Sequence, residues 1–250
     1  MKPLNPCGYV VYMSENALVS CVLNVLEAYT VTPKGRLAGR EGLETYGSLY
    51  GQVLEVEGGP TVCRVELANV DTSTKQGGDF VDYNQDAMVL KADTTAAFWP
   101  HLSFLGDFHS HTYSSVKDAE EMRGYLFSDD DWKDMERNKN FWKELSMKVS
   151  LLFTVAGLER AGNKPAWWID GLDHCIQFTL GNMRLWIAAY CLYIDAKGQV
   201  SWTNDEDGSV MLHCPSVTGF AGELSTYGRI WIGGRNAPVY RSARYSQKDW

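Results

Sequence analysis

The sequence predicts an α/β protein in which a mixed β-sheet is flanked by helices and extended by a β-rich C-terminal part. Three observations lead to this prediction. The chain opens with strand and helix patterns in the order β-α-β-β, it contains uninterrupted apolar segments of strand length, and it carries an amphipathic segment between two of them. With 250 residues, 45% hydrophobic and 12% aromatic, the chain is long enough to bury a sizeable core.

The N-terminal elements are predicted from local patterns. Residues 8–13 are β-branched and aromatic, as in a strand, and Ser14 is placed to cap a following helix whose apolar residues recur on one face. Residues 52–56 and 62–70 are predicted as paired strands joined by a Gly-Gly-Pro turn. Residues 71–86 are polar and contain glycine, so they are predicted to form an exposed loop.

The rest of the chain alternates strand and helix patterns. Residues 102–108 are predicted to form an apolar strand that ends at a His-Ser-His motif. Residues 129–147 are predicted to form an amphipathic helix capped by Ser128, and residues 149–155 a strand covered on both faces. Further strands are expected at 166–170, 176–180, 185–195, 200–203, 229–232 and 239–240, with a hairpin turn at 195–198.

Composition and charge narrow the partner classes. The chain has 23 Lys and Arg against 31 Asp and Glu, and its formal net charge of −8 disfavours binding to nucleic acid. No apolar run reaches the roughly 18 residues of a membrane helix, and the N-terminus lacks the pattern of a signal peptide. The six cysteines are isolated, without a C-x-x-C pair. The expectation is a cytoplasmic protein with no membrane or nucleic-acid partner.

The chemistry-bearing segment is Gly106-Asp107-Phe108-His109-Ser110-His111. Residues two apart on a strand share a face, so Asp107, His109 and His111 project in the same direction and the two imidazoles can hold one metal ion. Paired surface histidines are the structural alternative, but the position at the end of an apolar strand favours a metal site. Asp107 is placed either to orient an imidazole or to act as a fourth ligand.

A hydrolytic metal site also needs a third protein ligand, and acids follow the histidines in two segments. Ser128-Asp129-Asp130-Asp131 lies at the start of a predicted helix, and Ser115-Val116-Lys117-Asp118 has the same spacing. A serine followed three residues later by an acid is also an N-terminal capping pattern. Each segment therefore has a purely structural interpretation as well.

Three segments, taken in order, resemble the JAMM (MPN-plus) metalloprotease family. The family pattern is E-x-x-G-x-L-x-G followed by H-S/T-H-P-x7-S-x-x-D. The matching segments are Glu44-Thr45-Tyr46-Gly47-Ser48-Leu49-Tyr50-Gly51, His109-Ser110-His111 and Ser128-Asp129-Asp130-Asp131, and the resemblance extends from about Tyr9 to Val155. It implies an MPN (cytidine-deaminase-like) fold. Residues 1–160 would form the catalytic core, with an inserted segment at 112–127, and residues 161–250 would complete or decorate the same domain.

The resemblance also implies a role for each site residue. His109, His111 and Asp131 would bind Zn²⁺. Glu44 would act as general base and later as general acid, and Ser128 would stabilise the oxyanion. The implied reaction is hydrolysis of the amide bond that follows the C-terminal tail of a ubiquitin-like protein, or of its conjugates, by zinc-activated water.

The sequence departs from the family pattern in two places. Thr112 stands where the family has proline, and the spacer between His111 and Ser128 is longer than the pattern allows. Using Ser115 and Asp118 would make the spacer too short. Asp131 is favoured because its segment precedes a clear amphipathic helix, which leaves residues 115–125 as an inserted helix or lid. The alternative third ligands are Asp118, Asp129 and Asp130.

Two other functions compete for the same residues. The segment from Asp107 to Ser114 also resembles D-x-H-x-H-T-x-x-S, the opening motif of PHP-type phosphoesterases, and this match accounts for Thr112. Such multi-metal sites lie on a distorted β/α barrel and need several later histidines, of which only His174 and His213 remain. The other alternative is a non-catalytic MPN-like scaffold that binds proteins. The presence of all the acids and histidines of the family pattern argues against this scaffold.

Overall fold

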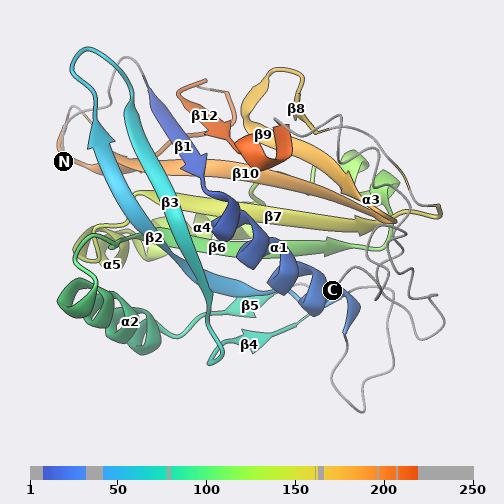
Figure 1. Cartoon of the computed structure of the whole chain (residues 1–250), viewed down its shortest axis with the longest axis horizontal. Helices are drawn as coiled ribbons and strands as arrows, with labels where there is room; N and C mark the ends of the chain where they lie inside the picture. Colours follow the sequence, from blue (N-terminus) through green and yellow to red (C-terminus); the bar gives the residue numbers. More distant parts are fainter. Residues whose placement is uncertain are drawn as a thin grey trace, which may run out of the picture.

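The computed structural model describes residues 8–31, 42–77, 80–160, 162, 166–195, 197–206 and 208–218. Strands and helices follow one another along this part of the chain as Figure 1 shows. The first half contains β1 (Tyr9–Met13), α1 (Glu15–Thr30), β2 (Tyr46–Glu55), β3 (Thr61–Val70), β4 (Lys75–Gln76), β5 (Val81–Asp82), α2 (Gln85–Phe98) and β6 (Ser103–Tyr113). The second half contains α3 (Val116–Glu121), α4 (Asp129–Arg137), α5 (Lys139–Glu144), β7 (Val149–Gly157), β8 (Trp167–Ile169), β9 (Leu172–Leu180), β10 (Met183–Ile194), β11 (Val200–Trp202), β12 (Val210–His213) and α6 (Pro215–Thr218).

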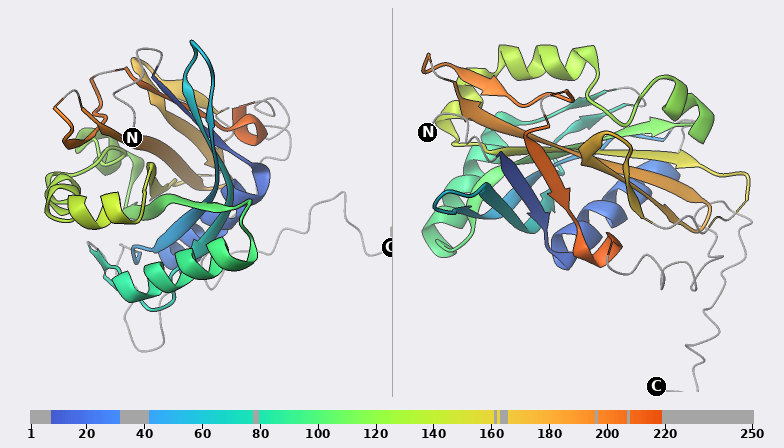
Figure 2. Two further views of the ribbon diagram at one scale, coloured as in Figure 1. Left: turned by 90° about the vertical axis from the view of Figure 1, so that its left-hand side faces the viewer. Right: turned by 90° about the horizontal axis from the view of Figure 1, so that it is seen from above.

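One large mixed sheet of ten strands curls into a half-barrel (Figure 2). Nine strands lie in the order β12-β1-β3-β2-β6-β7-β10-β9-β8, and β11 pairs with β10. β1 runs parallel to β3 and β12, and β6 runs parallel to β7, whereas the other neighbours are antiparallel. The curl brings the two ends of the sheet together, since Trp168 Nε1 donates to the carbonyl oxygen of Leu212 at 3.0 Å. The predicted α/β class with a mixed sheet is therefore confirmed.

Helices cover both faces of this sheet (Figure 2). α1 packs into one core cluster, and the buried side chains of α2, α3, α4 and α5 belong to a second cluster on the other face. β7 contributes to both, because Leu151 and Phe153 face α1 while Leu152 and Ala156 face the other helices. The strand predicted to be covered on both faces is thus confirmed. No helix of the described part is long and apolar enough to span a bilayer.

Several local predictions are confirmed. Ser14 caps α1, with its Oγ accepting a hydrogen bond from the amide of Ala17 at 3.3 Å. The strand pair predicted at 52–56 and 62–70 is present as β2 and β3, although β2 begins earlier, at Tyr46. The turn after β10 leads back into β11 as an antiparallel hairpin. The expected strands at 229–232 and 239–240 lie outside the described residues.

The prediction of one continuous helix over residues 129–147 is wrong, because this segment forms two helices, α4 and α5. Asn138 lies at the break with φ −101° and ψ 11°, outside helical geometry. Its Nδ2 donates to the carbonyl oxygen of Asp134 at 3.1 Å. The backbone amide of Asn138 makes the last helical hydrogen bond of α4, to the same carbonyl oxygen at 3.0 Å, and asparagine has a low helix propensity.

The loop predicted over residues 71–86 is also only partly correct. It contains the short β4–β5 hairpin, and it leads into α2, which the sequence patterns do not predict. The reason is that Met88 and Ala92 are the buried residues of α2, whereas Leu90 and Phe98 are exposed. Such a distribution does not produce the apolar periodicity by which a helix is recognised.

β6 is longer than the strand predicted at 102–108. It continues to Tyr113, because β7 pairs with it as far as that residue, while β2 pairs with it as far as His109. His109 and His111 therefore lie within a central strand rather than after its end. α3, capped by Ser115, occupies the segment where an inserted helix was expected.

The close contact between β6 and β7 depends on Gly106. Its φ is 152°, and a Cβ at this position would lie 1.7 Å from the carbonyl oxygen of Val149. We expect Gly106→Ala to lower the free energy of unfolding by about 3 kcal/mol or more, measured by chemical denaturation. In Gly157→Ala the new Cβ would lie 3.3 Å from Tyr29 Oη and 3.8 Å from the carbonyl oxygen of Ser114, so this control should change stability by less than about 1 kcal/mol. Equal losses in the two variants would contradict this account of Gly106.

Candidate metal centre

The two histidines of the His-Ser-His motif are held on one face of β6. His109 pairs with Tyr46 of β2 and with Leu152 of β7, so the backbone of the strand is fixed from both sides. His109 and His111 are both buried, and their ring centroids lie 5.2 Å apart. Because side chains two apart share a face, the central strand presents both rings to the same pocket.

Glu44 reaches this pocket through the continuation of the β2–β6 pairing. Just before β2, the amide of Thr45 donates to Ser110 Oγ at 2.9 Å, and the amide of Ser110 donates to the carbonyl oxygen of Thr45 at 3.0 Å. The preceding residue, Glu44, is buried and lines the pocket together with His109 and His111. The pairing thus joins the first and second segments of the family pattern.

Asp131 reaches the same pocket from the first turn of α4. Its Oδ1 lies 3.2 Å from His109 Nε2, and its Oδ2 lies 3.2 Å from His111 Nε2. It is also the third residue of a capping box, since Oδ2 accepts hydrogen bonds from the amide and the hydroxyl of Ser128, each at 2.7 Å. The capping and ligand interpretations of this segment are therefore compatible, because the carboxylate that caps the helix also faces both imidazole rings.

The donor atoms of His109, His111 and Asp131 form a group that could hold a metal ion. One ligand atom from each residue lies within 4.8 Å of the other two. His109 Nε2 is buried and makes no hydrogen bond to any described residue, although Asp131 is beside it. A buried ring nitrogen without a hydrogen-bond partner is costly, and a bound cation would satisfy it. Two imidazole nitrogens and one carboxylate are a donor set that suits zinc and other transition metals.

The ring of His111 is oriented by a backbone carbonyl. Its Nδ1 lies 3.1 Å from the carbonyl oxygen of Gly124, which also accepts a hydrogen bond from Thr154 Oγ1 at 2.9 Å. Nδ1–H as the donor leaves the lone pair of Nε2 directed toward Asp131. Gly124 is needed at this point because a Cβ there would lie 2.1 Å from the ring of Tyr113. The sequence analysis does not find Gly124, since it contributes a main-chain atom.

The site has a strongly negative field. Burial acts to lower the pKa of His109, but the carboxylates of Asp131, Asp107 and Glu44 outweigh it and raise this pKa to about 9. Burial acts to raise the pKa of Asp131, but the His109 and His111 rings lower it well below its usual range. The geometry and the charges therefore both favour a cation between these residues.

Asp107 lies in the pocket but outside the group of three candidate ligands. Its carboxylate accepts hydrogen bonds from Tyr46 Oη at 2.7 Å and from Ser150 Oγ at 2.6 Å. Burial raises its pKa to about 6, although these two hydrogen bonds act in the opposite direction. The same-face placement of Asp107 is as predicted, and Tyr46 is a pocket residue that the sequence analysis missed because its partner is distant in sequence.

Ser128 and the alternative acids occupy well-defined positions. Ser128 directs its hydroxyl proton to Asp131 and accepts the amide of Asp131 at 3.2 Å. Asp118 accepts hydrogen bonds from Ser114 and Ser115 at the start of α3, and Asp130 pairs with Lys133. Among the described residues, the group around the two histidines is completed by Asp131 and not by Asp118, Asp129 or Asp130.

A cavity of about 310 Å³ opens over these groups. The β4–β5 hairpin forms one wall and α4 forms another. The lining is rich in carboxylates: Glu44, Asp82, Asp107, Asp130, Asp131 and Asp134. The phosphoesterase alternative requires later histidines at the metal site, but these histidines make other contacts. His174 Nε2 lies 3.2 Å from Asp205, and His213 packs on Tyr12.

Comparisons with known proteins assign no family. Neither protein-family models nor curated protein sequences match the chain. The site is therefore interpreted from its own residues.

We expect the protein to bind one equivalent of Co²⁺, with the visible absorption of a site of low coordination number, and Zn²⁺ to displace it. His109→Ala, His111→Ala and Asp131→Ala should each weaken Co²⁺ binding by more than about a hundredfold, because loss of an outer partner of a ligand already costs ten- to a hundredfold. Titration followed by absorbance and calorimetry measures this. His101→Ala, a change at an exposed histidine, is the control and should bind as the wild type does. Equal Co²⁺ affinity in all four variants would show that His109, His111 and Asp131 do not bind the metal.

Proposed function

We propose that the chain is a zinc-dependent peptidase or isopeptidase of the JAMM type, with an MPN-like core. Its proposed substrate is the amide bond after the C-terminal tail of a ubiquitin-like protein. The observation that supports this function best is the meeting of His109, His111 and Asp131 in one pocket with Glu44. These residues come from three segments far apart in the sequence, and they are the segments that resemble the family pattern.

Zn²⁺ is the proposed metal because its preferred ligands are those that converge here, two imidazoles and a carboxylate. Zinc bound at such a site supplies Lewis acidity, which lowers the pKa of water and polarises a carbonyl group. The contribution of the chain is to keep the donor atoms in place. β6 fixes the two rings, the Gly124 carbonyl orients His111, and the cap of α4 presents Asp131.

Glu44 is the proposed general base and acid. A carboxylate oxygen of Glu44 would take a proton from the attacking water and then give it to the departing amine, as amide hydrolysis requires. This role needs a carboxylate in the pocket that is not itself in the ligand group. Glu44 meets both conditions, since it lines the pocket and does not belong to the candidate ligands.

Ser128 is proposed to act on the oxyanion and on Asp131. In the structure its hydroxyl donates to Asp131 Oδ2, so it positions a ligand. Donation to a substrate oxyanion would require the hydroxyl to rotate away from Asp131, while the amide of Ser128 keeps its own bond to the same carboxylate. The two hydrogen bonds of the cap allow such a change without loss of the ligand.

The proposed substrate is an extended peptide tail. The β4–β5 hairpin borders the cavity, and a tail could add to it as a further strand, held by backbone hydrogen bonds. Asp82, Asp130 and Asp134 also line the cavity, each paired with a Lys or Arg side chain, so basic side chains of a tail would compete with these partners.

The decisive variant is Glu44→Gln, which keeps the size of the side chain and removes the base. We expect it to lower kcat by at least about a hundredfold on fusions to the C-terminus of ubiquitin-like proteins, because general acid–base catalysis contributes at least that much. Its binding of Co²⁺ should be unchanged. Cleavage is measured by mass spectrometry of the products, with and without a chelator.

Glu57→Gln is the matched control, since Glu57 is exposed in the turn after β2. It should cleave at the wild-type rate. Full activity of Glu44→Gln would exclude Glu44 from the mechanism. Metal binding without cleavage of any fusion, but with turnover of a phosphate ester, would favour the phosphoesterase, and tight partner binding without either activity would favour the scaffold.

A further inference from the structure

A second polar network, formed by Tyr190, Asp205 and His174, lies outside the group of candidate ligands and has no role in the proposed chemistry. Tyr190 on β10 is fully buried, and its Oη donates to Asp205 Oδ1 at 2.9 Å. His174 on β9 is also buried, and its Nε2 lies 3.2 Å from the same oxygen. Asp205, in the segment after β11, therefore connects two strands of the sheet.

The hydroxyl of Tyr190 has a second hydrogen bond, which leads toward the metal centre. It accepts the amide N–H of Phe127 at 3.0 Å. A phenylalanine would bury the same ring without the cost of burying a hydroxyl, so this polar group is favourable only because both of its hydrogen bonds are made. The network thus fixes one backbone amide that lies outside any helix or strand.

Phe127 immediately precedes the cap that presents Asp131. Ser128, the next residue, caps α4 and donates two hydrogen bonds to the Asp131 carboxylate. The ring of Phe127 stacks on Tyr190 with centroids 3.9 Å apart, and its centroid lies 5.5 Å from that of His109. Tyr190 therefore contacts, through Phe127, the element that carries one candidate ligand and the ring of another.

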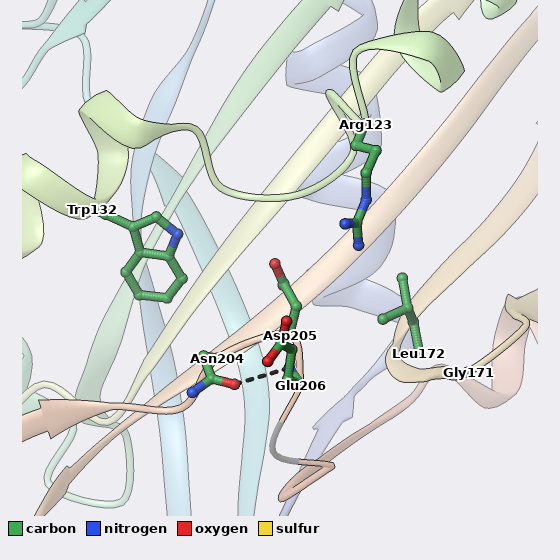
Figure 3. Close-up of a pocket in the computed structure, with 7 residues that line it drawn as sticks. All are labelled: Arg123, Trp132, Gly171, Leu172, Asn204, Asp205 and Glu206. Atoms are coloured by element: carbon green, nitrogen blue, oxygen red, sulfur yellow. Dashed lines mark hydrogen bonds between the residues drawn. The ribbon is translucent and has the colours of Figure 1, made fainter.

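Figure 3 shows the outer side of this network, a cavity of about 440 Å³ with Asp205 in its wall. Trp132, the residue after Asp131, also lines this cavity. Arg123 lines it too and directly precedes Gly124, whose carbonyl oxygen contacts His111. Glu206 lines the same cavity, but no hydrogen bond joins it to Tyr190 among the described residues. Glu206 is therefore a natural control for Asp205.

We propose that Tyr190 is a positioning residue for the metal centre. Its hydroxyl is held by Asp205, which His174 also contacts, and it fixes the Phe127 amide, which sets the position of the α4 cap and so of Asp131. The inference rests on the proposed function in one respect, because it concerns the same three candidate ligands. Its main consequence is a higher affinity for the metal. A well-placed ligand needs no rearrangement when the metal binds, so its affinity for the metal is higher.

The test is Tyr190→Phe, which removes one oxygen and keeps the stacked ring. We expect Co²⁺ affinity to fall by about 10- to 100-fold, as is usual when a partner that orients a ligand is lost. In the metal-free protein, the amides of residues 127–132 should exchange hydrogen faster than in the wild type. Tyr193→Phe, on the same strand, is the matched control and should change neither value.

A merely structural role is separated from positioning by a second comparison. Val11→Ala weakens the core on the α1 face, far from the cap, and should lower the unfolding midpoint without changing Co²⁺ affinity. Asp205→Ala should reproduce the effect of Tyr190→Phe, and Asp205→Asn should restore part of the affinity because its amide oxygen still accepts a hydrogen bond. Glu206→Gln should bind as the wild type does.

The possible results distinguish this inference from the proposed function. Unchanged Co²⁺ affinity and unchanged amide exchange in Tyr190→Phe overturn the positioning role, even if the wild type is a peptidase. Loss of affinity in Tyr190→Phe supports the role, even if no peptide substrate is cleaved. A wild-type protein that binds no divalent metal overturns both.

Discussion

The pairing of β6 with β2 on one side and β7 on the other is the constraint on which the site depends. It fixes the backbone of His109 from both sides and that of His111 from β7, so that two rings two residues apart face one pocket. The same pairing, continued one residue beyond β2 through Thr45 and Ser110, brings in Glu44. A central strand has no free edge to fray, and a site built on it is therefore more rigid than one built on a loop.

Asp131 shows how a helix cap can orient a candidate metal ligand. The capping box of α4 would form with any acid at this position, and replacing such a cap residue typically costs about 1 kcal/mol. Here the capped carboxylate also faces both imidazole rings. The energy that starts the helix thus also orients the carboxylate. The sequence pattern allows a cap or a ligand at this position, and the geometry is compatible with both.

Much of the fold could be predicted because its signals are local. The Ser14 cap, the β2–β3 pair and the doubly covered β7 follow from residue patterns within each segment. α2 could not be predicted, since its exposed Leu90 and Phe98 obscure the periodicity. Within the site, the shared face of His109 and His111 follows from strand alternation. Gly124 contacts His111 from 13 residues away in the sequence, and Tyr190 contacts Phe127 from 63 residues away, so neither contact leaves a local pattern.

The burial of so many acids gives the last argument for a cation. Glu44, Asp107 and Asp131 are grouped around His109 in a cavity of about 310 Å³, and the burial of several carboxylates together is unfavourable unless positive charge lies near them. Two responses to this repulsion and desolvation are visible: burial raises the pKa of Asp107 to about 6, and the acids raise that of His109 to about 9. Both reduce the negative charge of the pocket, that of Asp107 only below about pH 6. A divalent ion at the three donor atoms would do so more completely.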